Sequence, residues 1–234
     1  DTLAGGDGSD GYFVSDGGDV VSETNAVLAT GGTDTVYSYL SAYTLTANVE
    51  NGRILATLAA NLTGNTLNNV LYAGAGNNIL NGGTGTDSDT VSYAYGQAGT
   101  TGVTVSLAVN TAQATGGSGS DTLLGIENLI GSAYADRLTG NSGANSLSGA
   151  AGNDTLDGGT GIDTMAGGDG SDGYYVRDSG DIVSETNATT STGGNDIVYS
   201  TLAAYTLTAN IENGRILSTT AANLSGNSGN NVLY

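Results

Sequence analysis

Residues Gly131 to Tyr175 read GSAYADRLT, GNSGANSLS, GAAGNDTLD, GGTGIDTMA and GGDGSDGYY when they are divided into nines. Position one is always glycine, and position six is always aspartate or asparagine. Glycine permits the positive φ angles of a tight turn. Residues seven to nine are long enough for a short strand with one side chain facing inward. The nine-residue period therefore predicts stacked turns and short strands.

Position eight of these units carries a large apolar side chain, which we predict to be core. The series is Leu138, Leu147, Leu156, Met165 and Tyr174. Elsewhere, Val103, Val105 and Leu107 alternate with polar residues, as in a half-buried strand. Residues 116–124 read GGSGSDTLL and are expected to form a further complete unit.

The unit has the form GGxGxDxUx, where U is large and apolar, and resembles the nonapeptide of the repeats-in-toxin (RTX) family of secreted calcium-binding proteins. The resemblance implies an all-β fold, a right-handed parallel β-roll or β-solenoid with two nonapeptides in each coil. It also implies Ca²⁺ between turn n and turn n+2, export by type I secretion, and folding outside the low-calcium cytosol. The likeness is strongest at 1–22, 82–91 and 116–184, and the metal-binding turns are missing from 37–62 and 93–115.

The composition favours a cation as partner. There are 40 Gly, no Pro, Cys or His, and 23 acidic residues against 4 basic ones, for a net charge of −19. Such acidity excludes nucleic acid and anionic membranes as attractive partners. Without His or Cys the chain lacks the usual ligands of zinc and copper, and without His or Lys it lacks common catalytic motifs. We therefore predict that it is not an enzyme.

The position-six residues are the predicted metal ligands. The aspartates are Asp1, Asp10, Asp19, Asp34, Asp121, Asp136, Asp154, Asp163, Asp172, Asp181 and Asp196, with either Asp87 or Asp89 in a unit that contains an insertion. Weaker sites are expected at Asn69, Asn78, Asn145 and Asn231. Turn carbonyls such as those of Gly5, Gly8, Gly149, Gly152, Gly158, Gly161, Gly167 and Gly170 would complete the coordination. The alternative is that Asp and Asn only close Asx-turns.

Stacking of turn n on turn n+2 should produce two acidic ladders. Asp136, Asp154 and Asp172 would lie on one side of the roll, and Asn145, Asp163 and Asp181 on the other. Like charges a few ångströms apart repel strongly in a partly desolvated turn. Ca²⁺ prefers six to eight oxygen ligands and would remove this repulsion.

A much longer repeat is also present. Residues 163–234 repeat residues 1–72 without a gap, with about 54 of 72 positions identical. The offset of 162 is 18 × 9, so residues 1–162 are expected to form one complete long repeat of about nine coils, and 163–234 the start of a second. Loops are expected near 23–31 and at the equivalent 185–193. Because Asp1 falls at position six and neither end has a cap, we expect a piece of a longer tandem array that associates end to end or laterally.

These features predict a non-catalytic calcium-binding structural repeat of a secreted bacterial surface protein, at the cell surface or beyond it. An adhesin stalk, a matrix fibre and a surface-layer filament all fit. The alternative is the carboxy-terminal secretion and folding module of an extracellular enzyme, such as a protease or lipase. No run of about 18 apolar residues is present, so membrane insertion is not expected.

Overall fold

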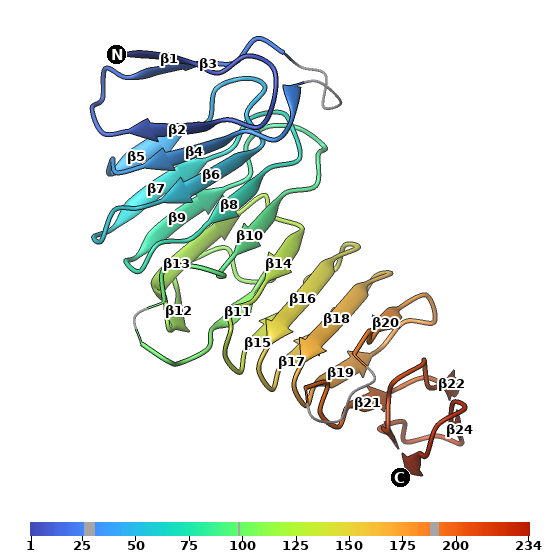
Figure 1. Ribbon diagram of the computed structural model, residues 1–234. Helices are drawn as coiled ribbons and strands as arrows, with labels where there is room; N and C mark the ends of the chain where they lie inside the picture. The colour runs from blue at the N-terminus through green and yellow to red at the C-terminus, as the bar shows by residue number, and fades with distance from the viewer. Residues whose placement is uncertain (26–30, 98, 188–191) are drawn as a thin grey trace. The chain divides into compact units, whose positions relative to one another are not determined.

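The computed structural model describes residues 1–25, 31–97, 99–187 and 192–234. Short strands are joined by turns into parallel stacked coils, which confirms the predicted all-β solenoid (Figure 1). The loops predicted near 23–31 and 185–193 lie partly outside the described residues. In the described part of the chain, no helix is long and apolar enough to cross a membrane.

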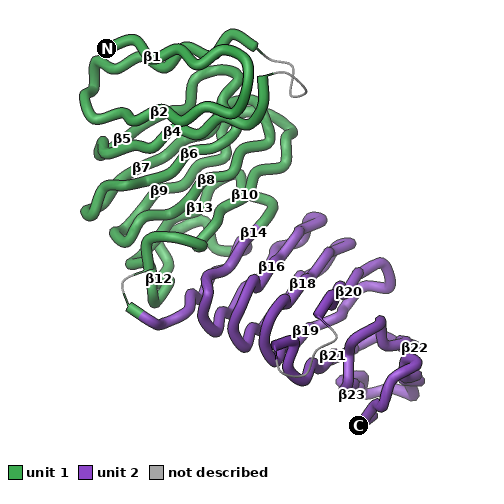
Figure 2. The backbone as a smooth tube through the Cα atoms, viewed as in Figure 1, with its two compact units in different colours: residues 1–99, 109–128 green, residues 100–108, 129–234 purple. Residues whose placement is uncertain are grey.

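The chain divides into two compact units (Figure 2). Unit 1 comprises residues 1–99 and 109–128, and unit 2 comprises residues 100–108 and 129–234. The boundary at 162–163 between the two sequence repeats therefore falls inside unit 2.

Unit 1 has two sheets of stacked parallel strands and a smaller pair. One sheet contains β2 (Gly11–Val14), β4 (Thr35–Ser38), β6 (Asn51–Ile54), β8 (Val70–Tyr72) and β10 (Thr90–Ser92). The other contains β5 (Ala42–Thr44), β7 (Ala60–Thr63), β9 (Asn78–Asn81), β13 (Gly119–Leu124) and β12 (Gln113–Gly116). The pair is β1 (Thr2–Ala4) and β3 (Val20–Ser22).

Unit 2 is built in the same way. One sheet contains β11 (Thr104–Ser106), β15 (Arg137–Thr139), β17 (Thr155–Asp157), β19 (Gly173–Val176), β21 (Ile197–Ser200), β23 (Asn213–Ile216) and β25 (Val232–Leu233). The strands that alternate with them are β16 (Ser146–Ala151), β18 (Thr164–Asp169) and β20 (Ile182–Ser184), followed by the pair β22 (Ala204–Thr206) and β24 (Asn223–Ser225). The chain passes between the units at β14 (Asn128–Ile130).

Strand register confirms that two nonapeptides make one coil. Leu138 lies opposite Leu156, and Leu156 lies opposite Tyr174, each 18 residues further along the chain. On the alternate strands Leu147 lies opposite Met165. These five position-eight side chains are all buried. In these units the core is therefore a column of inward-facing position-eight residues.

The unit predicted at residues 116–124 is only partly regular. Strand β13 joins the solenoid, since Thr122 pairs in parallel with Ile79 of β9. Its first residues instead pair antiparallel with β12. Gly116 and Gly119, with φ of 76° and 82°, allow this reversal. The prediction of a solenoid turn here was wrong, because the glycines close a hairpin.

Aromatic side chains stack from coil to coil outside the core. The rings of Phe13 and Tyr37 lie 4.8 Å apart on β2 and β4, and those of Tyr175 and Tyr199 lie 4.9 Å apart on β19 and β21. The two pairs occupy equivalent positions 162 residues apart. The long sequence repeat therefore reproduces side-chain packing as well as strand positions.

We predict that Leu156→Ala lowers the free energy of unfolding by about 3 kcal/mol, because it removes a buried side chain from the column and leaves a cavity. Ile162→Ala is the matched control, since Ile162 is 65% exposed, and should cost less than about 0.5 kcal/mol. Urea denaturation at a fixed calcium concentration measures both. Equal losses would contradict the assignment of position eight to the core.

Candidate metal centre

The position-six carboxylates of unit 2 form a hydrogen-bonded column, which we call the carboxylate file. Its members are Asp136, Asp154, Asp172 and Asp196. In each step, Oδ1 of one aspartate accepts a hydrogen bond of 2.7 Å from the backbone N–H of the preceding aspartate. At one end Asp136 accepts from Val103 N–H, and at the other Glu212 accepts from Asp196 N–H. Each coil thus holds the turn of the coil before it.

The same bond occurs on the opposite side of unit 2 and throughout unit 1. Asp163 accepts from Asn145 N–H and Asp181 from Asp163 N–H, at 2.9 and 3.1 Å. In unit 1 the acceptors and their donors are Asp34 with Asp10, Glu50 with Asp34, Asp89 with Asn69, Glu127 with Asp89, and Asp121 with Asn78. The two predicted ladders are therefore present, with each carboxylate held against its neighbouring coil.

Sequence reasoning missed the glutamates that continue these columns. Glu50 and Glu212 cap the backbone N–H of Asp34 and Asp196 across a spacing of 16 residues, outside the nonapeptide period. A usable signal was the identical ENGRIL at residues 50–55 and 212–217. Glu127 has no such signal, because it follows its partner Asp89 by 38 residues.

Four position-six aspartates keep a second oxygen that is buried and has no hydrogen-bond partner among the residues the structure describes. They are Asp10, Asp154, Asp163 and Asp172. A methyl group at Gly149 would overlap Asp154 Oδ2 and lie 2.8 Å from the Gly167 carbonyl oxygen of the next coil. Carboxylate and carbonyl oxygens therefore converge on the space that the missing side chain leaves. Two oxygens that face one small space, one of them an unpartnered carboxylate oxygen, fit a hard cation.

The backbone angle at position two decides which aspartates keep this oxygen. In the four turns concerned, position two is Gly6, Ala150, Gly159 or Gly168, with φ of 94°, 77°, 94° and 103°. At Asp136, Asp19 and Asp181, position two is Ser132, Ser15 or Arg177, and its N–H donates to Oδ2. The positive φ turns the position-two N–H away, so the second oxygen stays available for a cation.

Asp19 and Asp181 fit the alternative Asx-turn interpretation. Oδ2 of Asp181 accepts from Arg177 N–H and Asp178 N–H, and Oδ1 accepts from Asp163 N–H. Asp19 makes the equivalent turn bonds, and its Oδ1 pairs with the amino group of the exposed Asp1 at 2.9 Å. Both oxygens of each aspartate are already occupied by donors.

At the asparagine positions, the side-chain amide supplies a hydrogen-bond donor where an aspartate would need a cation. Asn69 Oδ1 accepts from Asn65 N–H, and its Nδ2 donates to the carbonyls of Val49 and Glu50 at 3.0 Å. Asn78 and Asn231 make corresponding bonds to the preceding coil, and Asn145 accepts from Asn141 N–H. The turns at these asparagines are closed by the chain's own hydrogen bonds.

In the inserted unit the two candidate aspartates divide the features of a position-six residue between them. Asp89 is buried and caps Asn69 N–H, which is the bond of the carboxylate file. Asp87 lies beside Gly85 and keeps one buried oxygen without a hydrogen-bond partner among the described residues. Asp121 is fully buried, with Thr115 Oγ1 at 3.5 Å from its Oδ2.

Burial disfavours the charged form of these carboxylates. It raises the pKa of Asp154, Asp196 and Asp121 to about 7 and those of Asp172 and Asp89 to about 6. Neighbouring carboxylates raise the pKa of Asp154 and Asp196 further. Among the described residues, the side-chain ion pair joins Arg177 to Asp157, which is not one of these carboxylates. No arginine in the described part of the chain is therefore paired with the aspartates whose pKa is raised. A divalent cation would supply the missing positive charge.

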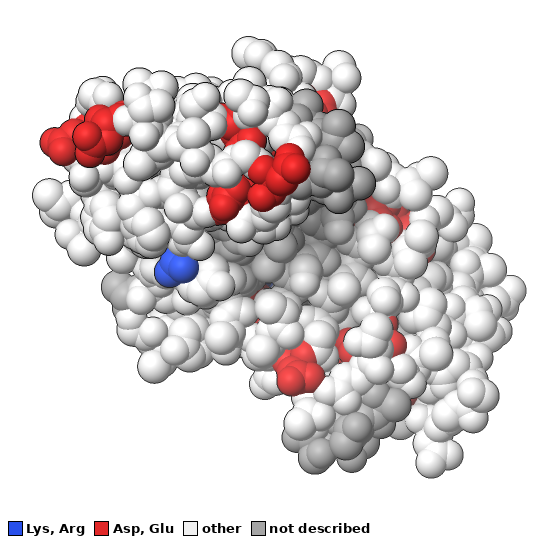
Figure 3. Space-filling view, turned by 45° about the horizontal axis from the view of Figure 1, so that its top comes forward, with Lys and Arg blue, Asp and Glu red and all other residues white. Residues whose placement is uncertain are grey.

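The surface shows the consequence of placing acids inside the turns. On the face seen in Figure 3, acidic atoms form a few separate patches and most of the surface is uncharged.

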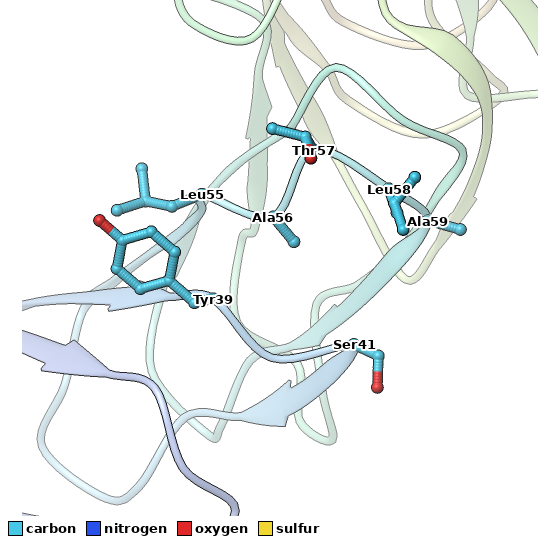
Figure 4. Close-up of a pocket in the computed structure, with 7 residues that line it drawn as sticks. All are labelled: Tyr39, Ser41, Leu55, Ala56, Thr57, Leu58 and Ala59. Carbon is cyan, nitrogen blue, oxygen red and sulfur yellow. The ribbon is translucent and has the colours of Figure 1, made fainter.

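Unit 1 also has a surface pocket of about 450 Å³ without acidic residues (Figure 4). It is lined by Tyr39, Ser41 and residues 55–59, which carry no charge, so it offers no carboxylate ligand for a cation.

Comparison with known proteins agrees with this geometry. Residues 61–88, 124–156 and 148–182 match the family model of the RTX calcium-binding nonapeptide repeat, in four copies. No curated protein matches the chain. The matched segments include Asn69, Asp136, Asp154, Asp163 and Asp172.

We predict that Asp154→Asn lowers the number of calcium ions bound, whereas Asp181→Asn leaves it unchanged. Asp154 has the unpartnered buried oxygen, and both oxygens of Asp181 already accept backbone hydrogen bonds. Calorimetric titration of the two variants gives the stoichiometry. An equal loss in both would contradict the sorting of sites by the position-two angle.

We also predict that the calcium-free protein gains stability as the pH falls from 8 to 5. The pKa values of Asp154, Asp172 and Asp196 in the fold are about 6 to 7, above the value of about 3.9 in an unfolded chain. Their contribution is therefore complete below about pH 4 and is lost as the pH rises through 6 to 7. Thermal melts in calcium-free buffer test this. Excess calcium should weaken or reverse the trend, because the ion binds ionised carboxylates.

Proposed function

Because the chain carries RTX calcium-binding nonapeptide repeats, we propose that it is a calcium-stiffened, non-catalytic rod segment of a secreted bacterial surface protein. That the chain is a calcium-binding part of a secreted protein follows from the family, whose repeats form such domains. The rod role is our proposal. The observation that carries it is the 162-residue repeat, which reproduces both the sequence and the carboxylate contacts of residues 1–72.

Stiffness would come from the bonds between coils. Each file carboxylate already joins two coils through a backbone N–H. A cation held by Asp154 Oδ2 and the Gly167 carbonyl would add a second link between neighbouring coils. Solenoids are stabilised mainly by nearest-neighbour contacts, so calcium at many turns would resist bending along the whole stack.

Calcium would also make folding depend on the compartment in which the chain lies. Before it binds, the buried carboxylates oppose folding through their desolvation and mutual repulsion. Extracellular calcium modules bind with dissociation constants of about 10⁻⁴ to 10⁻³ M. Such a chain would have low stability in a low-calcium cytosol and would complete its folding after export by type I secretion.

Self-association is part of the proposal. A net charge of −19 keeps neighbouring molecules apart, and calcium bridging between exposed acids would reduce that repulsion. Tandem repeats of one type of coil lengthen the solenoid, which suits an adhesin stalk, a matrix fibre or a surface-layer filament. A secretion module attached to an enzyme needs no such repeat.

We predict that electron microscopy of the native material with calcium shows rods or filaments with an axial repeat of about 36 Å or a multiple of it. The sequence period predicted nine coils in each 162-residue repeat, but the strand order from β2 to its equivalent β19 gives about seven and a half, because several coils are longer than 18 residues. At a strand spacing of about 4.8 Å this is about 36 Å. Removal of calcium should disperse the rods and reduce the β-sheet circular dichroism signal. Compact particles that carry a hydrolase domain would favour the alternative role, in which the repeats serve secretion and folding of an enzyme.

A further inference from the structure

Three buried carboxylates meet in unit 2 at a place that the nonapeptide motif does not predict. Asp172, Glu185 and Asp196 each place one oxygen within 4.8 Å of the other two, and their exposed fractions are 1%, 6% and 1%. Asp172 and Asp196 come from neighbouring coils, directly before β19 and β21. Glu185 directly follows β20, on the alternate strands of the roll. We call this group the DED cluster.

Hydrogen bonds satisfy only part of the DED cluster. Glu185 accepts from Tyr174 OH at 2.9 Å and from Asn187 N–H at 3.0 Å. The Oδ1 atoms of Asp172 and Asp196 cap the preceding coils. Asp172 Oδ2 is buried and has no hydrogen-bond partner among the described residues.

The unpartnered oxygen points into the cluster. A methyl group at Gly167 would overlap both Asp172 Oδ2 and the Tyr174 hydroxyl oxygen, so these two atoms border the same small space. Tyr174 in turn donates to Glu185. Asp172 Oδ2 therefore faces the phenol–glutamate pair, and a donor or a cation is missing at this point.

The same arrangement occurs independently in unit 1. Asp10, Glu23 and Asp34 form a cluster with the same 4.8 Å limit, each 162 residues before its counterpart. Tyr12 OH donates to Glu23 at 2.6 Å, and Asp10 Oδ2 is unpartnered among the described residues. Gly5 borders Asp10 Oδ2 and the Tyr12 hydroxyl, as Gly167 does in unit 2.

We propose that each DED cluster is a calcium site in which a nonapeptide turn, that of Asp172 or Asp10, gains a ligand from outside the motif, Glu185 or Glu23. Three carboxylates offer a concentration of charge and hard oxygen that suits Ca²⁺. Asp172 and Asp196 are 24 residues apart, whereas regular coils such as Asp154 to Asp172 span 18. The ion therefore connects Asp172 and Asp196, at the two ends of the longer coil, to Glu185 between them in the sequence.

This site should fill before the turns of the carboxylate file. Three carboxylates within 4.8 Å attract a divalent ion more strongly than the single unpartnered oxygen of a turn such as that of Asp154. Tyr174 and Tyr12 give each site a built-in reporter, because a nearby phenol sensitises the luminescence of Tb³⁺ bound at a calcium site.

The test is Glu185→Gln in the full chain. Glutamine keeps an acceptor for Tyr174 OH and removes one charge, so the fold should persist. We expect the bound calcium to fall by one ion, the first Tb³⁺ luminescence step to halve, and the calcium-induced rise in Tm to shrink. In calcium-free buffer the variant should be at least as stable as the parent, because a like charge has gone.

Glu23→Gln is the matched variant and should remove the other ion, and the double variant should remove both. Unchanged stoichiometry and half-saturation in Glu185→Gln would overturn the proposal. So would an equal loss of stability with and without calcium, since that marks a purely hydrogen-bonding role. Failure of the rod model leaves these counts unaffected, because they do not depend on filaments. Asp154→Asn reports separately on the turn sites.

Discussion

The fold depends on one repeated contact, in which an aspartate at the start of each strand accepts a hydrogen bond from the backbone of the preceding coil. The contact fixes the turn, but it also buries a carboxylate above another carboxylate, as Asp154 and Asp172 show. Burial favours the neutral acid, and a second nearby charge favours it further. At neutral pH the stack therefore needs positive charge inside its turns, which the four arginines do not supply.

One backbone angle determines how each turn meets this need. With φ outside the left-handed region at position two, as at Ser132 and Arg177, the N–H satisfies the second carboxylate oxygen. With positive φ, as at Gly168 and Ala150, that oxygen keeps no donor. Ala150 shows that the angle belongs to the turn and not only to glycine, since its φ is 77° despite its Cβ. A positive φ at position two of the nonapeptide thus leaves the second carboxylate oxygen without an amide donor.

The nine-residue period was sufficient to predict stacked turns, short strands and a buried position eight, because strands and inward side chains follow a fixed spacing. The family resemblance supplied the solenoid with two nonapeptides in each coil, and from it followed the two ladders. The period could not predict contacts that leave it. Glu212 reaches Asp196 across 16 residues, and Glu185 meets Asp172 only because a longer coil folds back between them. The period also says nothing about the direction of an N–H, so Asp181 looks like a metal ligand in sequence although donors occupy both its oxygens.

The mixture of aspartate and asparagine at position six divides the stack into regions with different needs. Around Asn69 and Asn78, amide groups bond to the carbonyls of the preceding coil, and the turns close with the chain's own donors. From Asp154 to Asp172, each turn in succession keeps an unpartnered buried oxygen. The first region can pack whenever its apolar column forms, whereas the second at neutral pH carries buried carboxylates that oppose folding until they are neutralised. Because each coil rests on its neighbour, coils that close by themselves provide a surface on which the ion-dependent coils assemble.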